Sequence, residues 1–104
     1  MLAKFEHTQG ISKVTFNKTI TAFCPLGDDY YTAHINVEFA PDKVMMDYLD
    51  EEDYFKSLSG TKMIIEDLVA AVHKRYTDTY SPKYVKVTVF AENATHFPVT
   101  VVKE

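Results

Sequence analysis

Tryptophan is absent from the sequence, cysteine occurs once, and glycine occurs only three times in 104 residues. A single cysteine excludes an intrachain disulfide and the zinc sites that need several thiolates. No apolar run is long enough to cross a membrane, and residues 1–7 are too polar for a signal peptide. We therefore expect residues 1–104 to form one small domain in the reducing cytoplasm, with residues 1–10 as a polar N-terminal arm.

Basic residues do not dominate the composition, since 11 lysines and arginines stand against 15 aspartates and glutamates and the formal net charge is -4. This balance argues against general affinity for the nucleic-acid backbone. The four histidines are far apart and lack the spacing of metal ligands, so we expect no metal site. The sequence also lacks a glycine-rich phosphate loop and the Gly-x-Ser-x-Gly motif of serine hydrolases.

Two runs of alternating apolar and polar residues, at 11–23 and 31–39, predict two half-buried strands. The connection at 24–29 contains proline, glycine and two aspartates, which favour a turn. The two strands are therefore expected to form an antiparallel hairpin.

The rest of the chain predicts a short extended piece, two helices and two more strands. Residues 44–48 are expected to be extended, and the acidic residues 47–55 to form a short helix. Thr61 is expected to cap a second helix over residues 62–76, which a loop at 78–82 follows. The last two strands are predicted at 84–90 and 97–102, with a turn at 92–95 between them. This order predicts an α+β fold, in which a four-stranded antiparallel sheet carries two helices between its second and third strands.

A few side chains stand out as candidates for a site. Cys24 ends the first predicted strand; a lone cysteine is most often a buried inert thiol, but because a turn follows it we predict that this thiol is accessible. Glu66 lies on the second predicted helix, either as an exposed carboxylate or as a ligand for a polar ring edge. Tyr30, Tyr31 and Phe97 flank turns and are candidates for stacking on a planar ring.

Several of these residues occur in a register that resembles a known family. Residues 24–25 are Cys-Pro at the end of a strand, residues 41–43 are Pro-Asp-Lys, and residues 66–67 are Glu-Asp, eighteen residues before Tyr84 by their numbers. This arrangement resembles the tunnelling fold. Within that fold it is most similar to the 7-cyano-7-deazaguanine reductases of queuosine biosynthesis and to the related amidinotransferases that make archaeosine in transfer RNA.

The resemblance implies a reaction and a place for it. Cys24 would add to the carbon of a nitrile and give a covalent thioimide, while Glu66 would hold the guanine-like ring. The proton-transferring aspartate of the family falls at Tyr31, so Asp28 or Asp29 would move the proton. Tunnelling-fold subunits assemble into barrels with ring-binding sites between subunits, which implies a pentameric ring or a decamer of identical chains.

The chain also departs from the family pattern. Ile65 stands where the family has histidine, and the segment 47–54 holds five acids and no base where the reductases bind NADPH. Because phosphates prefer arginine or lysine, this segment argues against NADPH. Three interpretations remain: a reductase-like enzyme, an amidinotransferase that uses ammonia and transfer RNA, and a purine- or pterin-binding protein without chemistry.

Overall fold

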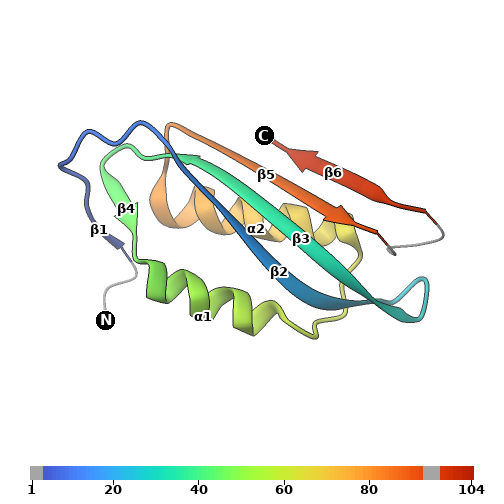
Figure 1. Cartoon of the computed structure of the whole chain (residues 1–104). Coiled ribbons are helices and arrows are strands. Elements are labelled where there is room, and N and C mark those ends of the chain that lie inside the picture. The colour runs from blue at the N-terminus through green and yellow to red at the C-terminus, as the bar shows by residue number, and fades with distance from the viewer. Residues whose placement is uncertain (1–3, 93–96) are drawn as a thin grey trace.

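The computed structural model describes residues 4–92 and 97–104, and a curved antiparallel sheet with two helices on one face makes up most of it (Figure 1). The sheet has the strand order β2-β3-β5-β6. Its elements are β2 (Val14–Cys24), β3 (Asp29–Ala40), α1 (Tyr48–Leu58), α2 (Ile65–Tyr80), β5 (Tyr84–Ala91) and β6 (Val99–Lys103). The predicted α+β class and the ββααββ order are confirmed. The turn predicted at 92–95 lies mostly outside the described residues.

The N-terminal arm is not only an arm, because part of it forms a strand. β1 (Lys4–Glu6) pairs antiparallel with β4 (Val44–Met46), so that Phe5 lies opposite Met45 in a separate two-stranded sheet. The pairing continues past β1, where the His7 amide donates to the Lys43 carbonyl at 2.9 Å. Such a short pair has little alternation to reveal it in the sequence.

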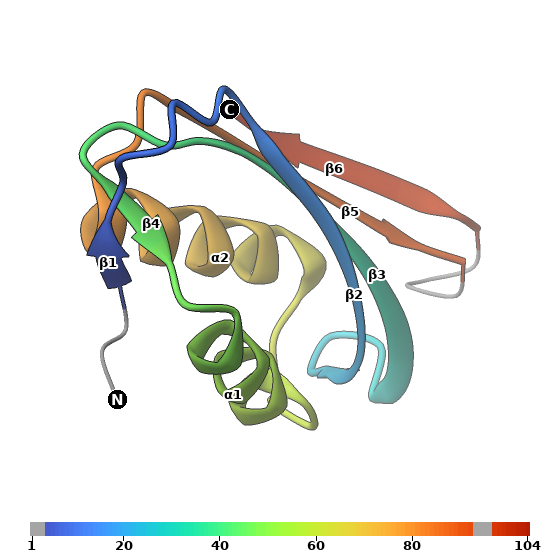
Figure 2. The same ribbon diagram turned by 60° about the vertical axis from the view of Figure 1, so that its left-hand side comes forward.

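The core lies between the inner face of the large sheet and the two helices (Figure 2). The alternation in the sequence supplies the sheet side, because every second residue of β3 from Tyr31 to Phe39 is buried. The helices form the other side of the core, with buried residues of α2 at helical spacing. The buried residues of α2 are Ile65, Leu68, Val69, Val72, Tyr76 and Tyr80.

The second helix is shifted toward the C-terminus compared with its predicted range of 62–76. Its N-cap is Ile64, without a side-chain cap, and Thr61 is not the cap because its hydroxyl donates to the Leu58 carbonyl. Residues 61–63 are extended beside β2, so the helix begins only after them. At the other end the predicted loop is wrong, because the helix continues to Tyr80, which is buried, and stops at Ser81 in the left-handed region.

A buried carboxylate joins the two helices. Glu51 of α1 is 4 % exposed and accepts hydrogen bonds from the hydroxyls of Tyr76 and Tyr80 on α2. Arg75 donates to Glu51 at 3.3 Å and to Asp50 at 2.8 Å. The two tyrosines recur at a spacing of four residues, which places both on the same face of the helix and explains why α2 extends that far.

Candidate functional site

The residues predicted to form the site gather at one end of the sheet. The tip of the β2-β3 hairpin, the start of α2 and the end of β5 all lie at this end (Figures 1 and 2). Two backbone hydrogen bonds join the hairpin to the segment before α2. The Phe23 amide donates to Thr61 at 2.9 Å, and the Met63 amide donates to Phe23 at 2.9 Å. The residue after Phe23 is Cys24, so the thiol lies beside the segment that leads to Glu66.

Cys24 is buried in the single chain, with 8 % of its surface exposed, whereas its place before a turn predicted an accessible thiol. The prediction was wrong because β2 continues to this residue, and the alternation of the strand turns Cys24 inward together with Ala22. The following turn closes over the sulfur. The Asp28 amide donates to the Cys24 carbonyl at 2.8 Å, and the Gly27 amide points at the Cys24 Sγ at 3.4 Å.

The two candidate proton-transfer residues differ in their position. Asp28 lies in the turn with a φ of 54°, in the left-handed region, which aspartate tolerates better than most residues. Asp29 begins β3 and lies directly opposite Cys24 in the pairing register. Cross-strand partners share a face of the sheet and have Cβ atoms about 5 Å apart, so the side chain of Asp29 starts on the same face as the thiol. Its Oδ1 accepts a hydrogen bond from the Tyr30 amide at 2.7 Å.

Tyr31 does not offer its ring for stacking, because only 2 % of its surface is exposed. Its hydroxyl donates to the Met63 carbonyl at 2.6 Å and so spans from β3 to the segment before α2. Burial, with further contributions from the charges of Cys24 and Glu66, raises the pKa of Tyr31 to about 12. The hydroxyl therefore stays protonated at neutral pH and cannot replace an ionised aspartate. No pattern in the sequence indicates the Met63 carbonyl as its partner.

Glu66 and Asp67 occupy the first turn of α2, where the positive end of the helix dipole favours acids. Both side chains are exposed. The charges of both carboxylates contribute to the raised pKa of Tyr31, after burial and the charge of Cys24. The structure thus places the start of α2, with Glu66, at the same end of the sheet as Cys24 and Tyr31 (Figure 1).

Aromatic side chains lie on the opposite face of the hairpin tip. The ring of Tyr30 is exposed and meets the ring of Phe23 edge to face with centroids 5.1 Å apart, while the Lys62 ammonium lies 5.8 Å from the centre of the Phe23 ring. Phe97, predicted to bind the ring, is 64 % exposed and precedes β6 at the same end of the sheet. No contact joins Phe97 to Cys24 among the described residues.

The acidic segment predicted to oppose NADPH has mainly structural roles. Asp47 caps α1 by accepting from the Leu49 amide, Asp50 pairs with Arg75, and Glu52 pairs with Lys18 at 2.7 Å. Two cations that reach this segment, Lys18 and Arg75, are thus already paired with its acids. The segment fits a cofactor with several phosphate charges poorly, because phosphates need unpaired arginine or lysine.

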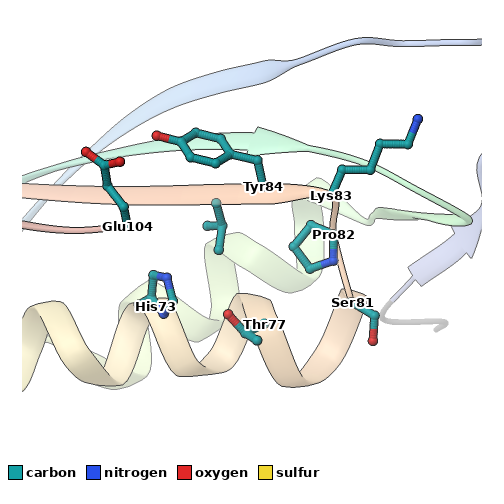
Figure 3. A pocket seen from close by; sticks show the side chains of 8 residues that line it. His73, Thr77, Ser81, Pro82, Lys83, Tyr84 and Glu104 are labelled. Carbon is teal, nitrogen blue, oxygen red and sulfur yellow. The ribbon is translucent and has the colours of Figure 1, made fainter.

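A hollow of about 430 Å³ lies at the other end of α2. His73 and Thr77 face it from the helix, and Tyr84 and Glu104 border it from the strands (Figure 3). Burial and the charge of Lys103 lower the pKa of His73. Thr77 is eleven residues beyond Glu66, which is about 16 Å along a helix, so the hollow is separate from the thiol.

No described residues form a group of three or more side chains suited to a metal ion. No helix in the described part of the chain is long and apolar enough to cross a membrane.

These features define an α+β chain in which a cysteine-bearing hairpin meets the first turn of the second helix. Neither the protein-family models nor the curated proteins yield a match to the sequence. Among solved structures, the fold is that of the crystal structure of the archaeosine synthase QueF-Like in its apo form. The TM-score is 0.83, the match covers 91 % of this chain and 94 % of that chain, and the sequences are 22 % identical.

Proposed function

We propose that this chain binds a guanine-like ring that carries a nitrile and forms a thioimide through Cys24, as part of 7-deazaguanine metabolism. One observation carries the proposal: the backbone bonds from Phe23 to residues 61–63 bring the thiol and Glu66 to the same end of a fold shared with an archaeosine synthase. The sequence resemblance and the fold thus support the same chemistry from different directions.

The proposed addition is complete without another reactant. The Cys24 sulfur forms a bond to the nitrile carbon, the carbon–nitrogen triple bond becomes a double bond, and the thiol proton ends on the nitrogen. Asp29, opposite Cys24 in the register, is the better placed of the two turn aspartates to carry that proton. Glu66 would accept hydrogen bonds from the N–H edge of the ring and hold the nitrile against the sulfur.

Two observations favour an amidinotransferase over a reductase for the next step. The matched structure is titled an archaeosine synthase, and the segment 47–54 offers paired rather than unpaired cations to a phosphate-bearing cofactor. In this branch ammonia would attack the thioimide carbon, giving an amidine and returning the thiol. This branch requires no hydride from NADPH. The net charge of -4 requires that transfer RNA be held by a local basic surface and not by the overall charge.

Mass spectrometry of the protein mixed with 7-cyano-7-deazaguanine tests the proposal. We expect one adduct per chain with the mass of the nitrile compound, and no adduct for Cys24→Ser under the same conditions. An adduct that survives in Cys24→Ser would place the chemistry elsewhere. The absence of any adduct would leave ring binding alone and favour the purine- or pterin-binding interpretation.

Adding ammonia or NADPH to the preformed adduct separates the two enzyme branches. Ammonia should break the carbon–sulfur bond of the adduct and release the nucleobase, or transfer RNA that carries it, from the enzyme in its amidine form, with return of the free thiol mass. NADPH should not be oxidised, which absorbance measures directly. Rapid oxidation that depends on Cys24 would contradict this assignment and support the reductase.

A further inference from the structure

Tyr31 is conspicuous at the candidate site, because a buried phenol joins the strand next to the thiol to the segment before the helix that carries Glu66. Within the described part of the chain, its hydroxyl donates a hydrogen bond to the Met63 carbonyl at 2.6 Å, and the side chain is almost fully buried. Tyr31 lies opposite Ala22 in the pairing register, two residues before Cys24. Its side chain therefore shares the inward face with the thiol.

Met63 has a matching position on the other side of the site. Its amide is bonded to the Phe23 carbonyl, and its carbonyl is bonded to Tyr31. One residue later the chain reaches Ile64, the N-cap of α2, and two residues after that it reaches Glu66. The helix has no side-chain cap of its own, so the position of its first turn depends on the bonds that hold residues 61–63.

We propose that Tyr31 is a positioning residue of the proposed site, whose hydroxyl holds the start of α2 so that Glu66 faces the thiol. This inference rests on the proposed function, and it assigns to Tyr31 a role that requires a permanent proton. The raised pKa of about 12 agrees with that role, because the hydroxyl remains a donor over the whole neutral range. Tyr31 then transfers no proton itself, and the ionisable groups nearby are left to do so.

The test compares Tyr31→Phe with Tyr48→Phe, which removes the hydroxyl of an exposed tyrosine at the start of α1. Hydrogen exchange of the amides at 63–68 should become faster by about tenfold or more in Tyr31→Phe and stay unchanged in Tyr48→Phe, as expected for losing one buried hydrogen bond of about 1.4 kcal/mol. Unchanged exchange in Tyr31→Phe would overturn the inference.

Ligand binding gives a second readout that a general loss of stability would not reproduce. At a temperature where both variants are folded, guanine should bind about tenfold more weakly to Tyr31→Phe. Alkylation of Cys24 by iodoacetamide should change less than about twofold, because the thiol itself is not displaced. Equal losses in both measurements would indicate a disordered site and contradict a positioning role.

Failure of the proposed function can be distinguished from failure of this inference. If the wild-type chain does not bind guanine, the proposed function is wrong, while the exchange measurement still decides whether Tyr31 positions the helix. If Tyr31→Phe does not fold, 3,5-difluorotyrosine at position 31 keeps the ring and gives a more acidic hydroxyl. Raising the pH until that hydroxyl ionises should then lower the protection factors at 63–68, which compare the measured exchange rates with those of an unstructured chain at the same pH, and unchanged protection factors would refute the role.

Discussion

Replacing Glu51 by alanine should strongly destabilise the fold without touching the candidate site. The carboxylate is almost fully buried between α1 and α2, and it accepts a 2.5 Å hydrogen bond from the Tyr76 hydroxyl and another from the Tyr80 hydroxyl. Both tyrosines are buried, so water cannot replace the lost acceptor at either one.

The size of the effect follows from the groups left behind. A buried donor without a partner costs about 1–3 kcal/mol, and the Tyr76 hydroxyl loses its acceptor in this variant. The Tyr80 hydroxyl loses one hydrogen bond, which contributes about 0.5–1.5 kcal/mol. Arg75 keeps its bond to Asp50, so its charge is not left without a partner. We therefore expect Glu51→Ala to lower the free energy of unfolding by about 2–4 kcal/mol. The total free energy of unfolding of a domain is about 5–15 kcal/mol, so the variant should lose a large part of its stability.

Urea unfolding followed by circular dichroism measures this loss, and the chain provides matched controls. Glu52→Ala removes the neighbouring acid, which is exposed and paired only with Lys18, and it should change little. Glu51→Gln keeps one carbonyl acceptor, so its free energy of unfolding should lie between those of Glu51→Ala and Glu52→Ala. If Glu51→Ala were no less stable than Glu52→Ala, the assignment of Glu51 as a structural acid would be refuted.

Three further predictions concern pH, ligand and assembly. Since the pKa of Tyr31 rises from 10.0 in the unfolded chain to about 12 in the fold, its contribution to stability is complete below pH 10 and is lost between pH 10 and 12, by roughly 3 kcal/mol. Urea unfolding at alkaline pH should show a smaller loss of stability for Tyr31→Phe. Glu66→Gln should weaken guanine binding by about 1–3 kcal/mol in calorimetry, and unchanged binding would count against its role. Light scattering at micromolar concentration should show a ring of identical chains, because the large sheet has two open edges, and a monomer would refute this.

Most of the fold could be predicted because the alternation in β2 and β3 directly reports burial on one face. The start of α2 could not be predicted in the same way. Thr61 has the side chain of a helix cap, but its backbone bonds to β2, a segment almost forty residues earlier, and this tertiary contact overrides the local preference. The end of α2 was missed for a related reason, since Tyr80 is held in the helix by Glu51 of α1.

The candidate site could be predicted in part. The sequence identified Cys24 and Glu66, and the register of β2 with residues 61–63 explains how they come to the same end of the sheet. Burial of Cys24 was not predicted, because a turn sequence does not show how far the preceding strand continues. Burial of Tyr31 was missed because it was assigned to ring stacking, although it continues the alternation of buried residues in β3. The pairing of the acids in 47–54 also depends on Lys18 and Arg75, which are distant in sequence.

The contact between β2 and residues 60–63 also divides the outer edge of the sheet into two parts. The Thr21 carbonyl accepts from Gly60, and both backbone groups of Phe23 are bonded to residues 61–63. These positions are closed to any strand from another molecule. The earlier part of β2, from Val14 to Thr19, has no such cover among the described residues. A chain that extends the sheet on the β2 side can pair only along that earlier part. It must then diverge before Cys24, because residues 60–63 already occupy the edge at Thr21 and Phe23.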